Sequence, residues 1–475
     1  IYGLIYASGT TNALISGDTT GKSLITKEYL IANISSGSTS PITIVNTNSL
    51  VSTGLVGAEA QLGVGESVFF GQNAGSGSTG SWSNFIGTNA GYGTINANNS
   101  NFFGQNAGYL AVQAYQSNFL GQQAGYLANG AQYSNFIGAY AGSGATSANY
   151  SNFIGYLAGN GATTARHSNF IGRNAGNGAI DSDYSNFIGL SAGQDATGVS
   201  DANFFGEGAG QNAINADGSV FIGTYAGQNG AQSRASNFIG DSAGQNASGV
   251  TNSNFFGFAG SGAKDTSYSN FMGYSAGQNA TGVTNSNFFG QNAGSNATDV
   301  IGSNFFGQGA GNGATSATYS NFIGINAGQG ATNASYSNLI GYNVGTTFTN
   351  NTIGNNNIIV GTNVSLPSGT TNSINLGGVL FGTGTYSSTA GNPSVVAQTQ
   401  GKIGINVVNP TEALDVSGKG QFTSSVKVGN NSDVASASNV GAIRYNVSGT
   451  TSNIDMCMQT GVSTYTWVNI VSNNW

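Results

Sequence analysis

A five-residue motif that recurs at a fixed interval dominates this chain. The motif reads Ser-Asn-Phe-Ile-Gly at residues 151–155, and close variants of it recur from Ser67 to Gly341. The interval is 17 residues, shortened to 16 only twice. A constant period in this range is typical of a solenoid, in which each repeat forms one coil that stacks on the next. The repeat therefore restricts more than half of the chain to a stack of similar coils.

The repeat is built from small residues and carries few charges. Gly accounts for 77 of the 475 residues, and charged residues make up 6%, against about 25% in a typical domain. Such a composition could indicate disorder, but disordered chains lack the periodic large apolar residues that a packed core needs. We therefore expect an ordered, all-β protein, with a parallel β-solenoid or β-roll of 17-residue coils and small β-rich ends.

The glycine at the fifth position of the motif is present in every copy, from Gly71 to Gly341. This invariance predicts a backbone with positive φ, or an approach so close that a Cβ atom would block it. Each short strand should therefore be followed by a tight corner. The eighth and ninth positions are Ala and Gly, as in Ala141-Gly142. These small residues predict a thin second strand, and hence a flat, narrow coil.

The third and fourth positions of the motif are both large and apolar, as in Phe153-Ile154. Neighbours on a strand point to opposite faces, so a thin coil can enclose only one of them. The other would form an exposed apolar stripe unless a second interface buried it. The third position carries sixteen Phe and Leu339, and at about 1.5 to 3 kcal/mol each one buried column contributes on the order of tens of kcal/mol. We therefore predict an obligate oligomer, intertwined or packed as a parallel homotrimer about a long axis.

The second position of the motif is Asn in nearly every copy, as at Asn152, and Val at Val68 and Val220. Stacked strands allow each side-chain amide to bond to its neighbours above and below, so an Asn ladder is expected. A row of Asn that contacts glycans is the alternative. The replacement by Val indicates a buried position and so favours the ladder.

The residue just before each motif forms a further column that is often aromatic. Aromatic rings can stack on the apolar faces of sugars, or pack on a neighbouring coil or chain with a hydroxyl left in water. The same column contains His167, the single histidine of the chain. Candidate glycan contacts are therefore Trp82, Tyr133, Tyr150, Tyr184, Tyr268, Tyr319 and Tyr336.

Several classes of function have little support in the sequence. The net charge is −7, with no basic cluster to neutralise phosphates, so no nucleic-acid partner is expected. Cys457 is the single cysteine, which provides neither a disulfide framework nor a set of metal ligands. No apolar run approaches the roughly 20 residues that span a bilayer, so no membrane insertion is expected.

Paired carboxylates, which most glycosidases need, are also lacking. The acidic residues are scattered, and only Asp181 and Asp183 lie close together, in a variable loop where solvated carboxylates are the norm. We therefore expect no enzymatic activity, no catalytic residues, no metal and no cofactor.

One copy of the motif, Ser219-Val220-Phe221-Ile222-Gly223, resembles the S-V-A-I-G head repeat of trimeric autotransporter adhesins. The heads of that family are left-handed parallel β-rolls wound as trimers. The resemblance extends over residues 67–341, although the period here is longer and Phe replaces a small residue. It implies a trimeric shaft built from rolled coils.

Two other segments resemble phage tail fibres. Residues 23–30, Ser-Leu-Ile-Thr-Lys-Glu-Tyr-Leu, resemble a phrase near the N-terminal parts of tail-fibre proteins. Residues 401–429 contain Gly-Lys-Ile-Gly-Ile-Asn and then Leu-Asp-Val-Ser-Gly, and resemble an element near the C-terminal ends of such fibres. We therefore divide the chain into an attachment segment (1–50), a shaft (51–361), a transition (362–400), the fibre C-terminal element (401–429) and a cap or tip (430–475).

These resemblances imply a non-enzymatic fibre of a phage tail. Its N-terminal end would attach to baseplate or other virion proteins, and its C-terminal region would contact a glycan or protein of the host surface. The alternative is a bacterial surface adhesin or an extracellular filament subunit. A tailspike that depolymerises polysaccharide is the third possibility.

Overall fold

A computed structural model describes residues 67–346, 352–385, 400–429 and 432–474. The chain divides into two compact units, residues 1–254 and 255–475, which are described separately. The all-β parallel solenoid expected from the repeat is confirmed. Helix in the described ranges is limited to the 3₁₀ turn η1 (Ala437–Asn439). The predicted attachment segment, residues 1–50, lies outside the described residues.

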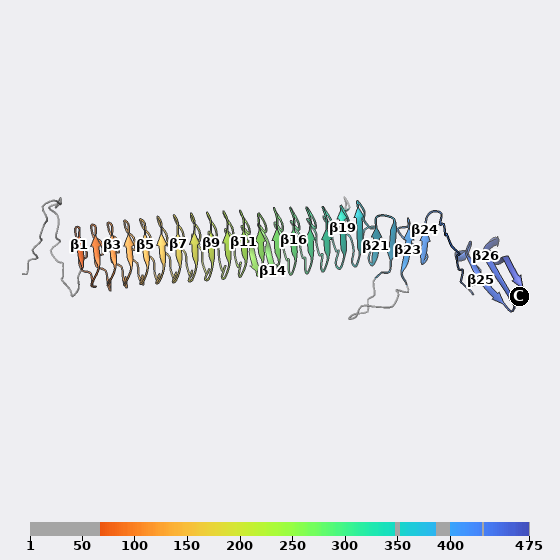
Figure 1. Ribbon diagram of the computed structural model, residues 1–475, viewed down its shortest axis with the longest axis horizontal. Coiled ribbons are helices and arrows are strands. Elements are labelled where there is room, and N and C mark those ends of the chain that lie inside the picture. Colours follow the sequence, from red (N-terminus) through yellow and green to blue (C-terminus); the bar gives the residue numbers. More distant parts are fainter. Residues whose placement is uncertain (1–66, 347–351, 386–399, 430–431, 475) are drawn as a thin grey trace, which may run out of the picture. The chain divides into compact units, whose positions relative to one another are not determined.

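The first unit places one short strand at each copy of the motif, over the second to fourth positions. Consecutive strands pair in parallel and in register, so that Asn152 lies opposite Asn169 and Phe153 opposite Phe170. Figure 1 shows these strands side by side. They are β1 (Val68–Phe70), β2 (Asn84–Ile86), β3 (Asn101–Phe103), β4 (Asn118–Leu120), β5 (Asn135–Ile137), β6 (Asn152–Ile154), β7 (Asn169–Ile171), β8 (Asn186–Ile188), β9 (Asn203–Phe205), β10 (Val220–Ile222) and β11 (Asn237–Ile239), with β12 (Ser248–Thr251) outside the motif.

The second unit continues with the same type of coil and then changes topology. Its solenoid strands are β13 (Asn254–Phe256), β14 (Lys264–Ser267), β15 (Asn270–Met272), β16 (Asn287–Phe289), β17 (Asn304–Phe306), β18 (Asn321–Ile323), β19 (Asn338–Tyr342), β20 (Ile358–Thr362) and β21 (Ser373–Leu376). Antiparallel pairing begins at β22 (Leu380–Thr383) and β23 (Lys402–Ile405), and β24 (Leu414–Val416) follows. A separate antiparallel sheet contains β25 (Ile443–Ser448), β26 (Thr451–Gly461) and β27 (Thr464–Asn474).

The core of each coil is one phenylalanine surrounded by small residues. In the coil of Phe153, the Phe side chain and Ala158, Ala162 and Ala165 are all fully buried. The ring lies against Gly159, where an added Cβ would approach a ring carbon to 2.3 Å. The rings of Phe153 and Phe170 stack with centroids 4.8 Å apart. The phenylalanine column is thus the interior of the solenoid.

This placement corrects the energetic argument for an oligomer. The column of Phe residues is buried within a single chain, so its burial requires no partner. The fourth position is the one left outside. Ile137, Ile188 and Ile222 are 36%, 37% and 39% exposed. The prediction that a thin coil encloses only one of the two apolar columns is confirmed, and the excluded column is that of Ile154.

The second face of the coil differs from the prediction. Ala141 and Gly142 lie in a turn, and Gly142 has a φ of 62°, which takes the backbone out of the strand region. The second parallel column instead consists of isolated bridges at the thirteenth position of the repeat, such as Asn129 with Thr146 and Thr146 with Thr163. The predicted second strand at the eighth and ninth positions is therefore wrong.

Most of the fifth-position glycines meet both of the expected requirements, whereas Gly257 has a positive φ of 84° but no atom nearer than 3.7 Å to an added Cβ. Gly155 has a φ of 137°, and a Cβ built there would lie 2.4 Å from the carbonyl oxygen of Gly172 in the next coil. The positive φ disfavours any residue other than glycine, and the close approach to Gly172 leaves no room for a Cβ atom. At Gly155 the corner after the strand therefore depends on glycine for two independent reasons.

We expect Gly155→Ala to destabilise the protein much more than Gly161→Ala. Gly161 also has a positive φ, 65°, but has no atom within 4 Å of an added Cβ, so its replacement costs about 1 kcal/mol from backbone strain alone. Gly155→Ala adds a steric clash with backbone, worth about 1 to 3 kcal/mol more. Urea-induced unfolding followed by circular dichroism would measure both values. Equal destabilisation by the two variants would contradict the role assigned to the close approach.

The Asn ladder predicted from the second position is present. The Nδ2 group of Asn152 donates to Oδ1 of Asn169 at 2.7 Å, and Asn135 donates to Asn152 at 2.6 Å. The expectation that this position is buried is wrong, because Asn152 is only half-buried. Strand alternation places the second and fourth positions on the same outer face, so the ladder lies beside Ile154.

Candidate functional site

The largest candidate surface is the column of fourth-position side chains, which we call the apolar stripe. Each member projects from the outer face of its strand and is exposed or half-buried. No charged residue occurs at this position. In the first unit the stripe consists of Phe70, Ile86, Phe103, Leu120, Ile137, Ile154, Ile171, Ile188, Phe205, Ile222 and Ile239, and in the second of Phe256, Met272, Phe289, Phe306, Ile323 and Ile340. Within each unit, a row of adjacent apolar side chains on the outer face is typical of an interaction site.

The sixth position of the repeat adds apolar side chains beside parts of the stripe. Tyr156 and Leu190 are 47% and 42% exposed in the first unit, and Tyr274 and Ile325 are 62% and 45% exposed in the second. Other coils carry polar residues at this position, such as Gln105. The stripe is therefore wider at some coils than at others.

The aromatic residues that precede the motif form partly continuous stacks. The rings of Tyr133 and Tyr150 stack at 4.7 Å, those of Tyr150 and His167 at 5.0 Å, and those of His167 and Tyr184 at 4.7 Å. Each of these residues has a φ between 57° and 60°, an uncommon conformation for large side chains. The amide of Tyr150 donates to the carbonyl oxygen of Gln132 in the previous coil, which helps to hold it. From Tyr133 to Tyr184 the aromatic residues therefore pack on one another in neighbouring coils, as the packing interpretation expects.

Stacking limits what these rings can bind. A sugar packs on the face of an aromatic ring, but both faces of Tyr150 and His167 are covered by their neighbours. Tyr319 and Tyr336 are tilted by 30° at 5.3 Å. Trp82 and Tyr268, each 60% exposed, do not stack on a ring of another described residue. Among the predicted glycan contacts, these two have the geometry best suited to a sugar.

Two titratable groups at or beside the aromatic column, Tyr133 and Arg166, have shifted pKa values. Desolvation raises the pKa of Tyr133 above its ordinary value, and Tyr115 and Tyr150 raise it further. Arg166 donates to Asp183 at 2.6 Å, and this hydrogen bond raises the pKa of Arg166. Asp183 was expected to be a solvated loop carboxylate, but its side chain is 14% exposed and bound to Arg166.

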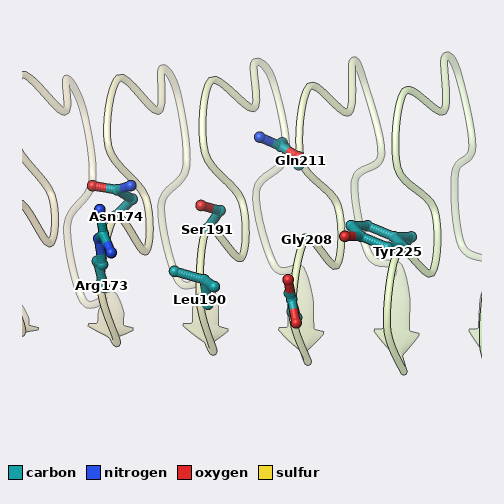
Figure 2. A pocket seen from close by; sticks show the side chains of 8 residues that line it. Arg173, Asn174, Leu190, Ser191, Gly208, Gln211 and Tyr225 are labelled. Atoms are coloured by element: carbon teal, nitrogen blue, oxygen red, sulfur yellow. The ribbon is translucent and has the colours of Figure 1, made fainter.

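A pocket of about 350 Å³ opens on the side of the first unit. Figure 2 shows its side chains arranged along successive coils. It exists because Gly208 takes the place of a larger residue, and the ring of Tyr225 lies over it, 2.6 Å from where a Cβ would be. Arg173 and Glu207 belong to the same column and are separated by Leu190. The lining residues are Arg173, Asn174, Leu190, Ser191, Glu207, Gly208, Gln211 and Tyr225.

The lining of this pocket is mostly polar, with one cation, Arg173, and one anion, Glu207. Glu207 is the only carboxylate among the lining residues, whereas most glycosidases pair two carboxyl groups. The Gln211 amide is already engaged, because its Oε1 accepts from Gln228 at 2.8 Å. Sequence reasoning did not find the pocket, and the only signal was a glycine where neighbouring coils have larger side chains.

The C-terminal sheet contains a buried polar cluster that the sequence did not predict. Arg444 donates to Asp455 at 3.1 Å, and both side chains are largely buried, at 14% and 8% exposure. The guanidinium of Arg444 also lies 4.1 Å from the ring centroid of Trp467, within the range of a cation–π contact. Asn446 and Asn469 donate to the same carboxylate. The cluster fixes the register of three strands.

Sequence reasoning also missed the role of the first-position serine. Ser151 Oγ donates to the carbonyl oxygen of Ala165 across the coil at 2.5 Å and accepts from the amide of Ser168 in the next coil at 3.1 Å. Both serines are fully buried. The signal available was the near-constancy of Ser at this position, which only Ala202 interrupts.

Other kinds of site are not found in the part of the chain that the structure describes. Within those residues, no group of three or more His, Cys, Asp or Glu side chains could hold a metal ion. No helix among them is long and apolar enough to cross a membrane. Searches against protein-family models, curated proteins and solved structures gave no match. The candidate surfaces above therefore rest on the geometry of this chain alone.

Proposed function

We propose that this chain is the shaft-forming subunit of a homotrimeric adhesive fibre, most consistent with a phage tail fibre. The observation that carries the proposal is the apolar stripe. A solenoid whose interior is already complete, and which still presents an uncharged column of Ile and Phe on its outer face, needs a partner to cover that column. Copies of the same chain, aligned in parallel, supply an equivalent column at every coil.

The assignment to a virion rests on the two segments that resemble tail-fibre elements, residues 23–30 and 401–429. On this proposal the N-terminal end attaches to other virion proteins, the stacked coils act as a stiff spacer, and the C-terminal region meets a glycan or protein of the host surface. No catalytic step is involved. A bacterial surface adhesin would use the same shaft, and neighbouring genes for capsid or baseplate proteins distinguish the two.

Sedimentation of the purified chain tests the assembly directly. We expect a trimer at micromolar concentration that persists in mild denaturant, because the stripe remains covered. A stable monomer that keeps its β structure would contradict the proposal.

Incubation with host surface polysaccharide tests the adhesive function separately. We expect binding without cleavage, whereas release of reducing ends would identify a depolymerase. Trp82→Ala and Tyr268→Ala, compared with Tyr150→Ala, would show whether exposed ring faces on the shaft contribute to that binding. If only Tyr150→Ala weakened it, the ring-face argument would be wrong.

A further inference from the structure

The C-terminal sheet of strands β25, β26 and β27 has two faces of opposite character. On one face lie Arg444, Asp455, Cys457 and Trp467. The segment that contains η1 packs against this face: the indole of Trp467 donates to the carbonyl oxygen of Asp433 at 2.8 Å, and the Cys457 thiol lies 3.2 Å from Oδ1 of Asn439. Cys457 is 1% exposed. This face is polar and hydrogen-bonded, and it is covered around Asp455 and Cys457.

The opposite face is apolar and open to solvent. Strand pairing aligns Ile443 with Met456 and Tyr445 with Ile454, and it aligns Met456 with Val468. Exposures are 47% for Ile443, 47% for Val447 and 58% for Val471. We call this surface the outer sheet face, and it comprises Ile443, Tyr445, Val447, Ile454, Met456, Met458, Val468 and Val471.

The size of this element indicates what covers the outer sheet face. The stretch from residue 432 to 474 is well below the roughly 70 to 80 residues at which a single core supplies ample stability, and close to the roughly 40 residues below which a disulfide, a metal or oligomerisation is usually needed. Cys457 is the single cysteine of the chain, so an intrachain disulfide is excluded. The described residues contain no group of three or more His, Cys, Asp or Glu side chains that could hold a metal ion. Of these three means of stabilisation, oligomerisation is the one that the sequence and the described residues leave open.

We propose that the outer sheet face packs against the same face of other copies of this chain, making the C-terminal sheet a self-association module. None of its eight side chains is charged, so identical faces can meet without like-charge repulsion. Sheets that pack face to face bury side chains between layers about 10 Å apart. The module serves the same assembly as the proposed function but depends on residues outside the apolar stripe.

Two neighbouring residues on β26 provide a matched test in the full-length chain. Met458 lies on the outer sheet face and is 43% exposed, and Gln459, the next residue, points to the opposite face and is also exposed. Each is replaced by Cys in a Cys457→Ala background. The Cys457→Ala protein is first shown to form an oligomer of the same size as the wild type. The two thiols are then treated with a maleimide, and separately with a bifunctional thiol reagent of about 10 Å, the spacing of packed sheets.

We expect the Met458→Cys thiol to react at least about tenfold more slowly than the Gln459→Cys thiol in the native protein, with equal rates after denaturation. The bifunctional reagent should join Met458→Cys chains and leave Gln459→Cys chains separate. Equal maleimide rates in a protein that is still oligomeric would overturn the module and leave the proposed fibre intact. Protection of Met458→Cys without interchain linkage would also overturn it. A monomeric parent protein would contradict both proposals.

Discussion

Phe153→Ala is expected to lower the free energy of unfolding of its region by about 3 to 5 kcal/mol, the usual cost of emptying a buried phenylalanine site. The ring is fully buried and stacks between Phe136 and Phe170 at 5.0 and 4.8 Å. The coil cannot collapse around the cavity, because its other interior side chains are already alanines. Urea-induced unfolding, together with hydrogen exchange resolved by segment, would measure the loss.

The effect should be confined to neighbouring coils. In a solenoid each coil contacts only the coils on either side, so exchange protection should fall around Phe136, Phe153 and Phe170 and remain unchanged near Phe85. Thr146→Ala, an exposed residue one coil away, is the control and should change stability by less than about 0.5 kcal/mol. A uniform loss of protection along the first unit would show that the coils unfold as a single cooperative block.

Placing aspartates at Ile154, Ile171 and Ile188 together is expected to weaken the oligomer severely while leaving the coil intact. The three side chains lie outside the coil, so the interior of Phe and Ala residues is unaffected. In the proposed assembly each carboxylate would be buried without a partner, at a cost of about 3 to 5 kcal/mol. Sedimentation across a urea series should therefore show dissociation at a much lower concentration than for the wild type.

The matched control carries the same three charges at the same spacing on another face. Thr146, Thr163 and Ile180 belong to consecutive bridges of the thirteenth-position column, where Lys264 already occurs. Aspartates there reproduce the like-charge repulsion between coils but leave the stripe apolar. Dissociation of both variants at the same urea concentration would contradict the stripe as the interface.

The main features of the coil could be predicted because they depend on local geometry. Alternation along a strand places Phe153 and Ile154 on opposite faces of the coil. The invariant glycine that follows each strand predicts a corner there. These inferences need only the period and the properties of single residues. The same alternation places Asn152 on the outer face with Ile154, so the expectation that it is buried conflicted with information already in the sequence.

The second column of bridges left only a weak signal in the sequence: its residues are mostly β-branched, which favours strands, but the series is interrupted by Asn129, Ala231 and Lys264. Ile95, Asn129 and Thr146 occupy equivalent places, and single bridging residues leave no alternation of polar and apolar positions. The pairing of Arg444 with Asp455 was equally hidden, because it depends on the register of the β25–β26 hairpin. Burial of the Phe column was wrongly attributed to a partner chain, because the small residues of the same coil already enclose each ring.

The sameness of the coils has a consequence for how copies of the chain would find their alignment. Every coil presents nearly the same side chains in the same order, so two chains displaced lengthwise by one coil would lose only the contacts of a single coil at each end. The repeated coils alone therefore favour the correct alignment only slightly over one displaced by a coil. Irregular places on the outer surface have to set the alignment, such as Val220 in the half-buried Asn column and the two shortened intervals. The non-repetitive C-terminal sheet would then fix which coil of one chain lies beside which coil of the next.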